Sequence, residues 1–440
     1  MAESTKRPGK GKRPGKTKET PSASPARAAA VALLGQVLGQ GRQLSDAMQA
    51  GSFARLDPAD RAAAQRLATD VLRNLPRCDQ VLKPRLRKAP PLSVRNVLRL
   101  GAYELCTGGA AHGVVNDCVS LSSADRKTKT MSGMVNAVLR RLADEGPELW
   151  AKLRVPRLPR WLRDPLVAAW GSPAVAEMER AHLAGAPLDI SVSANAEGWA
   201  ERLGADLLPT GSLRLADPGQ VSALPGFDEG GWWVQDAAAA LPAKLLGDVK
   251  GLQVLDMCAA PGGKTLQLAA GGAEVTALDL SEGRMARVLE NLIRTGLKAK
   301  TQVGDALEAT GSYDAILLDA PCSATGTIRR HPDLPHAKQG EGISELIGLQ
   351  EAMLDHALSL LKPGGRLVFC TCSLLPDEGE CHIEEALTRH DGLKVLPLDA
   401  PWIEDGWRSE EGGLRLRPDF WPERGGMDGF YMAVLEKPAG

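Results

Sequence analysis

Strand and helix signals alternate through the C-terminal half of this 440-residue chain, and this alternation constrains the fold more than any other feature. Short apolar runs, most of them ending in an acidic residue, occupy residues 252–256, 274–279, 315–319 and 366–369. Helical stretches lie between these runs, for example at 284–294 and 346–361. Alternating β and α segments are typical of a parallel, doubly wound sheet. We therefore predict an α/β domain over residues 236–440.

The first part of the chain has a different pattern, and its length calls for more than one core. Between residues 26 and 145 apolar residues recur at helical spacing and strand signals are scarce, which predicts an all-helical domain. Asp57 is a suitable N-cap, with Pro58 at the first helical position. Residues 146–185 resemble connecting helices, and 186–235 contain short apolar runs broken by Gly and Pro. The sequence thus predicts linker helices and a small α+β subdomain over 146–235.

Charge and cysteine content indicate where this protein works and in which state its thiols are. The net charge is −1, yet residues 1–25 carry seven basic side chains and little that could be buried: Lys6, Arg7, Lys10, Lys12, Arg13, Lys16 and Lys18. This composition predicts a disordered tail, which either is simply solvated or meets a polyanion. The chain has no apolar run of membrane-spanning length and no secretion signal, so we expect a cytoplasmic protein without a membrane partner. Its eight cysteines are then expected to be reduced thiols.

The turn after the first predicted strand of the α/β domain is suited to two kinds of nucleotide-like ligand. One is held through its phosphates, and the other through its ribose hydroxyls. In such sheets, ligands bind beyond the carboxyl ends of the strands. The stretch Pro261-Gly-Gly-Lys-Thr265 is close to a phosphate-binding P-loop, and 316–319 can pass for its magnesium-supporting acid. Cys258, however, stands where the first P-loop glycine is needed for the turn. Asp279 ends the next strand, where a carboxylate can accept hydrogen bonds from ribose hydroxyls. An NTPase is therefore disfavoured. Asp305 either belongs to this site or simply caps a helix.

Two cysteines follow two different strands, in Asp319-Ala-Pro-Cys-Ser323 and Cys370-Thr-Cys-Ser373. A single cysteine is usually a small buried hydrophobe, but two at the ligand edge of one sheet favour a chemical role. A zinc site is the alternative, with ligands from Cys370, Cys372, Cys381 and His382. The C-x-C spacing lacks the usual paired pattern, so we expect no metal.

If the ligand at the glycine loop is a methyl donor, covalent catalysis gives a reason for a thiol beside it. Addition of a thiolate to C6 of cytosine turns C5 into an enamine-like carbon, which can accept a methyl group. The thiol must ionise, and a helix N-terminus or a cation such as Lys264 can assist. Asp319 is a candidate to hydrogen-bond N3 of the base, and a second thiol can assist product release. Spacing alone does not say which cysteine attacks.

Three stretches resemble the RsmB/Sun (Fmu, NOL1/NOP2/Sun) family of RNA cytosine-C5 methyltransferases. They are 258–265, 319–327 with Arg329-Arg-His-Pro-Asp333, and Thr371-Cys-Ser-Leu-Leu-Pro376. The resemblance implies a Rossmann-type domain, Cys372 as nucleophile and Cys322 in product release. It also implies S-adenosylmethionine as cofactor, with contacts from Cys258, Ala259, Ala260, Pro261, Gly262, Gly263, Lys264, Asp279, Arg284, Asp305 and Asp319.

The resemblance continues toward the N-terminus. Residues 100–105, 114–117 and 133–141 are similar to the NusB-type helical RNA-binding domain of the bacterial branch. It implies an RNA partner, small-subunit (16S) ribosomal RNA before transfer RNA, and we expect a monomer. A non-catalytic assembly factor is the alternative from another class. Two features depart from the family: Cys370 stands where a small Ser or Ala is expected, and the basic tail lies outside the pattern.

Overall fold

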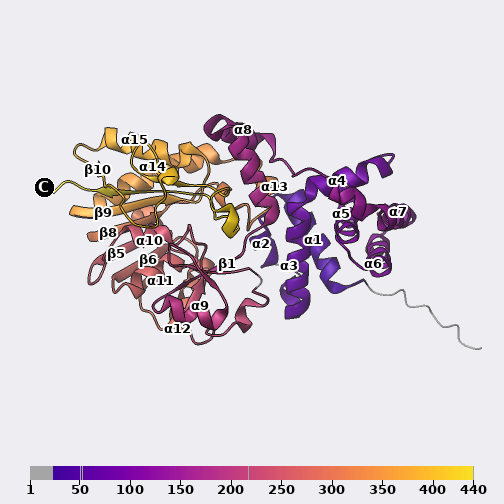
Figure 1. The fold of residues 1–440 in the computed structure, drawn as a ribbon, viewed down its shortest axis with the longest axis horizontal. Coiled ribbons are helices and arrows are strands. Elements are labelled where there is room, and N and C mark those ends of the chain that lie inside the picture. The colour runs from indigo at the N-terminus through magenta and orange to yellow at the C-terminus, as the bar shows by residue number, and fades with distance from the viewer. Residues whose placement is uncertain (1–22, 50, 52, 217, 440) are drawn as a thin grey trace, which may run out of the picture. The chain divides into compact units, whose positions relative to one another are not determined.

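The computed structural model describes residues 23–439 except residues 50, 52 and 217, so most of the predicted basic tail lies outside the described residues. The described chain forms two compact units that interleave in sequence (Figure 1). The first comprises the described parts of residues 1–35, 50–71 and 78–153, and the second those of 36–49, 72–77 and 154–440. None of the described helices is long and apolar enough to span a bilayer.

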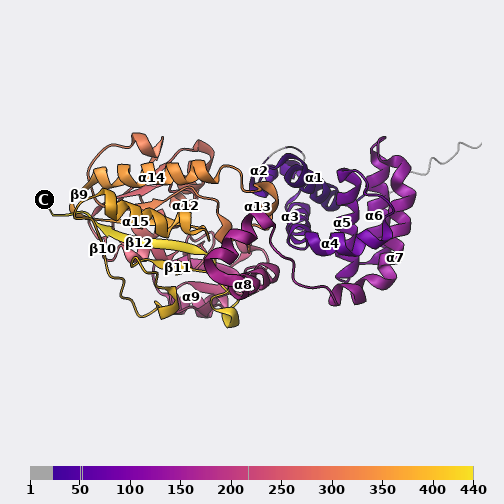
Figure 2. The same cartoon turned by 90° about the horizontal axis from the view of Figure 1, so that it is seen from above.

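The N-terminal part of the chain is helical, as predicted (Figure 2). Its helices are α1 (Pro25–Gln40), α2 (Leu44–Met48), α3 (Pro58–Arg73), α4 (Leu75–Leu82), α5 (Leu92–Cys106), α6 (Ala111–Ala124) and α7 (Ser132–Ala151). The backbone N–H of Asp60 donates to Oδ1 of Asp57 at 2.9 Å, so Asp57 caps α3 and Pro58 begins it. Within the first unit, α5, α6 and α7 pack against one another.

The region between residues 146 and 235 contains a small antiparallel sheet. Helix α8 (Arg160–Ala184) is interrupted at Gly171, whose φ of 77° is outside the helical range. The strands are β1 (Leu188–Val192), β2 (Asp206–Leu207), β3 (Leu213–Leu215) and β4 (Trp232–Val234), in the order β2-β3-β1-β4, with α9 (Ala196–Leu203) beside them. Ile190, Leu213 and Trp232 are fully buried in its core. The predicted β content is present; the predicted boundaries at 145 and 235 stay predictions.

The large sheet has the order β10-β12-β9-β8-β5-β6-β7, with β11 paired to β12. Its parallel strands are β5 (Gln253–Met257), β6 (Glu274–Asp279), β7 (Lys300–Val303), β8 (Tyr313–Asp319) and β9 (Leu361–Thr371). The remaining strands, β10 (Lys394–Val395), β11 (Leu414–Leu416) and β12 (Phe430–Glu436), pair antiparallel. The predicted α/β class with a doubly wound parallel core is therefore confirmed, and antiparallel strands extend the sheet at this end. Antiparallel partners need no crossover helix, so alternation along the chain stops there.

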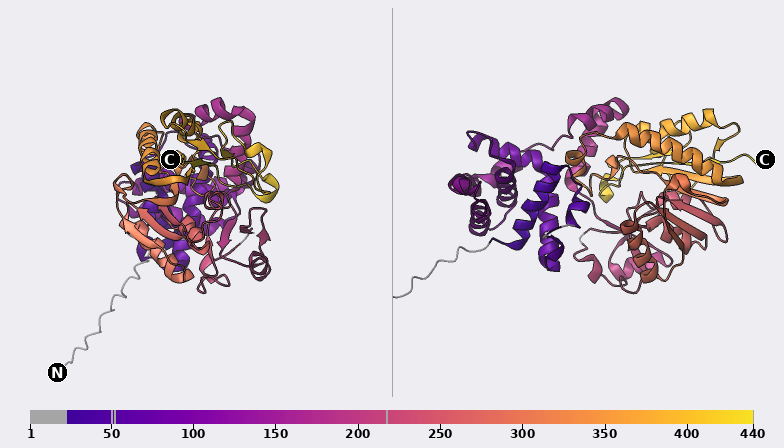
Figure 3. Two further views of the ribbon diagram at one scale, coloured as in Figure 1. Left: turned by 90° about the vertical axis from the view of Figure 1, so that its left-hand side faces the viewer. Right: turned by 180° about the vertical axis from the view of Figure 1, so that it is seen from behind.

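Helices cover both faces of this sheet (Figures 1 and 3). One face carries α14 (Ile343–Leu360) and α15 (Glu380–Arg389), and the other carries α10 (Leu241–Leu245), α11 (Gly263–Ala270) and α12 (Glu282–Thr295); the short α13 (Leu334–Ala337) precedes α14. Successive residues of a strand face opposite sides. Thus Ile316 packs with Leu354 in one core, and Leu317 packs with Leu241 in the other. These two cores hold the central strands rigidly and place their carboxyl ends along one edge.

Candidate active site

The predicted site residues meet at the carboxyl edge of four adjacent strands, β6, β5, β8 and β9. Parallel strands that are neighbours in a sheet end at the same edge. The ladder pairs Asp319, the last residue of β8, with Cys370 near the end of β9. The loop after β5 begins at Cys258, and Asp279 ends β6. The fold therefore gathers the acids, the glycine loop and both cysteine turns.

The glycine loop at 258–262 is held against the next strand by backbone contacts. The N–H of Ala259 donates to the carbonyl of Leu278 at 2.9 Å, and the N–H of Ala260 donates to Oδ2 of Asp279 at 3.1 Å. Gly262 has a φ of 104°, which favours glycine, and a Cβ there would meet Val288 at 3.2 Å. Cys258 also has a positive φ, of 62°. A side chain at this position is therefore compatible with the turn, so Cys258 does not exclude a P-loop on conformational grounds.

Electrostatics separates the two cofactor classes more clearly. Burial raises the pKa of the Cys258 thiol to about 12, and the charges of Asp319, Asp279 and Asp256 add to the effect. Lys264 pairs with Asp319, and the pKa of Asp256 is raised to about 7, so the acid left to act on a cofactor here is Asp279. Its carboxylate opposes a phosphate and is compatible with a positively charged sulfur.

The acids differ in what binds them. Asp279 is buried, and its Oδ1 accepts a hydrogen bond from the N–H of Ser281 at 3.0 Å. Arg284 lies 3.5 Å from Oδ2 of the same carboxylate and donates to the carbonyl of Ala260, which fastens the loop. Asp305 is exposed, and its Oδ1 accepts the N–H of Leu307 at 2.9 Å, so it does cap a short 3₁₀ helix. Its role toward a cofactor stays a prediction.

Lys264 is buried and pairs with Asp319, with 2.7 Å between Nζ and Oδ2. Burial lowers the pKa of its ammonium group, but the charges of Asp319 and Cys370 outweigh burial and the pKa is raised. Lys264 therefore stays protonated and neutralises Asp319. The extra thiol, Cys370, is fully buried and lies 3.5 Å from Oδ1 of Asp319.

The two cysteine turns bring Sγ of Cys322 and Sγ of Cys372 to 3.5 Å from each other, and both residues are partly exposed. The N–H of Gly326, in the turn after Cys322, donates to the carbonyl of Cys372 at 2.9 Å. The hydrogen bond with Cys372 raises the pKa of Cys322 well above its ordinary value, and burial and the charge of Glu378 act in the same direction. Cys322 is therefore held as a neutral thiol.

A zinc site was the alternative for the cysteines. In the described part of the chain, no three His, Cys, Asp or Glu side chains are grouped so that they could hold a metal ion. Nε2 of His382 lies instead 2.8 Å from Oε1 of Gln350.

Two charged groups near the thiols were not among the predicted site residues. Arg330, within the Arg-Arg-His-Pro-Asp stretch, donates from Nε to the buried Asp428 at 2.7 Å. Burial lowers the pKa of its guanidinium, but the charges of Asp428 and Asp236, with a smaller contribution from Cys372, raise it overall. Glu378 is fully buried between the two cysteine turns.

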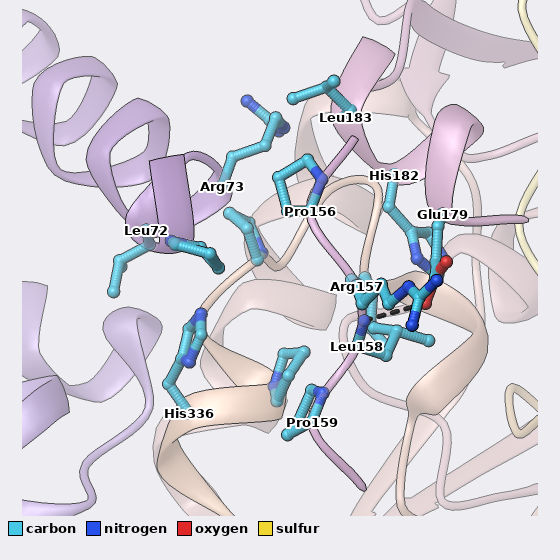
Figure 4. A pocket seen from close by; sticks show the side chains of 14 residues that line it. Leu72, Arg73, Pro156, Arg157, Leu158, Pro159, Glu179, His182, Leu183 and His336 are labelled. Atoms are coloured by element: carbon cyan, nitrogen blue, oxygen red, sulfur yellow. Dashed lines mark hydrogen bonds between the residues drawn. The ribbon is translucent and has the colours of Figure 1, made fainter. Parts of the chain in front are cut away.

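A separate cavity of about 50 Å³ lies elsewhere in the second unit, around the buried His182 (Figure 4). Prolines form much of its wall, and the N–H of Leu158 donates to Oε1 of Glu179 at 2.9 Å beside it. Among the described residues neither ring nitrogen of His182 has a hydrogen-bond partner. Burial and the charges of Arg329 and Arg73 lower its pKa to about 3, so the ring is neutral.

Comparison with known proteins agrees with this geometry. Residues 243–436 match the family model described as 16S rRNA methyltransferase RsmB/F, and residues 24–144 match the NusB family model. The chain is 35% identical to the ribosomal RNA small subunit methyltransferase B of Erwinia tasmaniensis, over 93% of this chain and 98% of the relative. The chain belongs to the RsmB/F methyltransferase family. The protein of the same name from Pseudomonas putida is 37% identical, over 94% of this chain and 98% of the relative.

Membership of this family makes the chain an S-adenosylmethionine-dependent RNA methyltransferase with a NusB-type N-terminal region, as the sequence predicts. The fold has a solved counterpart in the crystal structure of PH0851, which is 24% identical, with a TM-score of 0.73 over 94% of this chain and 99% of the other.

Proposed function

We propose that this RsmB/F protein methylates C5 of a cytosine in small-subunit (16S) ribosomal RNA, with Cys372 as nucleophile and Cys322 assisting product release. The observation that carries the proposal is the pair of partly exposed thiols, 3.5 Å apart, at the edge where the cofactor loop ends. The relatives named above supply the substrate, because both are ribosomal RNA small subunit methyltransferases.

The cofactor would lie along the loop 258–264, beside the buried carboxylate of Asp279. When bound, S-adenosylmethionine supplies a methyl group that is activated by the positive charge on its sulfur. Asp279 is placed to accept hydrogen bonds from the ribose hydroxyls, and Arg284 keeps the loop closed on it. Asp305 and Asp319 complete the acidic edge. Lys264 holds Asp319 in place.

The chemistry assigned to the thiols is balanced in three steps. The Cys372 thiolate forms a bond to C6, and the electron pair of the C5–C6 double bond becomes available at C5. C5 then forms its new bond to the methyl carbon as the bond from that carbon to the cofactor's sulfur breaks, which leaves a neutral thioether. Transfer of the C5 proton to water restores the double bond as the Cys372–C6 bond breaks, and the thiolate returns. Cys322, held as a thiol next to Cys372, is placed to assist this last step, and Asp319 to hydrogen-bond N3 of the base.

The target cytosine has to leave any base stack to reach Cys372, so the substrate is a single-stranded or flipped base. We assign RNA binding to the NusB-type region 26–145 and to the small subdomain in 146–235. The working chain is proposed to be a monomer in the cytoplasm, where its catalytic thiols stay reduced.

Transfer of a labelled methyl group tests the proposal. The purified protein is incubated with labelled cofactor and either 16S ribosomal RNA or transfer RNA, and the product nucleoside is identified by mass spectrometry. We expect 5-methylcytosine in 16S ribosomal RNA, no product with Cys372→Ala, and a covalent RNA–protein adduct with Cys322→Ala. Cys381→Ala, which removes a partly exposed thiol from α15, serves as the matched control and keeps activity.

Full activity of Cys372→Ala would contradict the nucleophile assignment. Methylation of transfer RNA alone would replace the proposed substrate. RNA binding without methyl transfer to either RNA would favour the assembly-factor alternative.

A further inference from the structure

One buried carboxylate joins the two cysteine turns. Oε1 of Glu378, in the 3₁₀ turn Pro376–Glu378, accepts a hydrogen bond from the backbone N–H of Ser323 at 2.8 Å. Oε2 accepts a hydrogen bond from the hydroxyl of Ser373 at 2.6 Å and another from the hydroxyl of Ser323. Ser323 directly follows Cys322, and Ser373 directly follows Cys372. Through these two serines a single side chain fixes both thiols.

A second layer of contacts holds this carboxylate. Nε2 of Gln350, from α14, donates to Oε1 of Glu378 at 3.1 Å and to the carbonyl of Pro321 at 2.8 Å. The hydroxyl of Thr371 donates to the backbone carbonyl of Glu378 at 2.7 Å. The residues on both sides of each cysteine are therefore tied to Glu378 directly or through Gln350. All three of these side chains are fully buried, so their geometry is rigid.

The charge of Glu378 acts on the Cys322 thiol. A buried carboxylate disfavours a second negative charge nearby. It contributes to raising the pKa of Cys322, after the hydrogen bond with Cys372 and burial. The guanidinium of Arg330 interacts with Cys372. On the other sides, Cys370 of β9 faces Cys372, His382 of α15 contacts Gln350, and Arg415 of β11 binds the carbonyl of Ser373.

We propose that Glu378 is a positioning residue for methyl transfer: it holds the two cysteine turns in register, so that the two thiols stay side by side. The proposal rests on the proposed function, since it assigns Glu378 to the reaction of those thiols. Glu378 does not touch the reacting atoms.

The test compares Glu378→Gln with Asp377→Asn, which removes one negative charge from the exposed neighbour in the same turn. Iodoacetamide alkylation of each cysteine is followed by peptide mass spectrometry from pH 6 to pH 10, without RNA or cofactor. In the wild type and Asp377→Asn we expect Cys372 to react first and Cys322 only at high pH. In Glu378→Gln we expect Cys322 to react roughly tenfold faster at a given pH, equivalent to about one pKa unit.

Steady-state kinetics gives the second readout. Loss of these hydrogen bonds should lower kcat by about 10- to 100-fold, because small misplacements of reacting groups have effects of that size. The KM for S-adenosylmethionine should not change, since the cofactor loop is intact. If Glu378→Gln does not fold, Ser373→Ala removes one of the hydrogen bonds and is expected to give a smaller shift of the same sign.

The proposal is overturned if Glu378→Gln, or Ser373→Ala in its place, matches Asp377→Asn in both alkylation and kcat. A shifted alkylation profile in a protein that methylates no RNA would support the assignment of Glu378 while refuting the proposed function. Normal RNA methylation by the wild type, together with an alkylation profile that Glu378→Gln leaves unshifted, would support the proposed function and refute the assignment of Glu378.

Discussion

At the scale of single residues, the charge states at the strand ends are set by burial. Asp256 lies near the end of the first strand of the site, fully buried, and its Oδ2 accepts a hydrogen bond from the hydroxyl of Thr265 at 2.6 Å. Burial raises its pKa to about 7. A carboxyl whose pKa is raised on folding binds a proton in the native state that the unfolded chain releases. Such a group destabilises the fold as pH rises from about 4 through 7.

Asp256→Asn should therefore change the pH dependence of stability. The amide oxygen can still accept the Thr265 hydrogen bond, and it has no proton to lose. We expect the unfolding free energy of the variant relative to wild type to improve with rising pH, by on the order of 1 kcal/mol per pH unit between pH 4 and 7. Urea unfolding at pH 5 and pH 8 measures this. Exposed Asp391→Asn is the control; equal pH slopes for the three proteins would contradict the assignment.

Residue types at strand ends were enough to predict much of the site. Asp279, Asp319 and the two cysteine turns follow recognisable apolar runs, so their gathering at one edge could be inferred. Glu378 could not be found in this way. Its neighbours Asp377 and Glu380 make the segment look solvated, and only the packing of α14 against the sheet buries it. The priority of Cys372 over Cys322 came from family resemblance alone.

At the scale of elements, the site depends on the close approach of two turns. The N–H of Gly429, just before β12, donates to the carbonyl of Gly326 at 2.8 Å. A Cβ on Gly326 would lie 2.0 Å from the carbonyl oxygen of Gly429. This contact is possible only for glycine, because the obstacle is backbone and cannot rotate away.

Gly326→Ala should consequently destabilise the protein by roughly 1–3 kcal/mol, the usual effect of overpacking, and lower methyl transfer by moving the carbonyl of Cys372. Thermal unfolding and kcat check both parts. Gly348→Ala is the matched control. This glycine lies in α14, and an added Cβ would have no atom within 4 Å. Alanine at this position should therefore stabilise the protein by about 0.5–1 kcal/mol. Equal stability of the two variants would show that the turns can separate without cost.

Element type was more predictable than element pairing. The apolar run Phe430–Glu436 is compatible with a parallel or an antiparallel strand, and periodicity cannot distinguish them. Strand β7 escaped prediction for another reason: Lys300–Val303 is polar and largely exposed at the sheet edge, so it lacks a burial pattern.

At the scale of the whole molecule, the basic segment before residue 23 bears on RNA affinity. Binding to phosphates releases counterions, so each phosphate that is bound steepens the fall of affinity with salt. Deleting residues 1–22 should weaken binding at low salt and make the plot of log affinity against log salt shallower, by about 0.7 for each single-strand phosphate that the tail had neutralised. A full-length variant with its seven tail Lys and Arg residues changed to Gln should behave like the deletion. Binding titrations at several salt concentrations measure this slope. If both the deletion and the Gln variant keep the slope of the full-length protein, the tail binds no phosphate.

The position of β12 has a consequence for synthesis. This strand lies between β9 and β10 in the sheet, yet it is made some 60 residues after β9, whose residues 366–371 it pairs with. A chain emerging from the ribosome can fold its helical N-terminal elements early, since their contacts are local. Strand β9, which leads into the turn of the proposed nucleophile, has an open edge until residues 430–436 have been made. The catalytic centre can therefore be completed only after β12 is synthesised, well after both cysteines have left the ribosome.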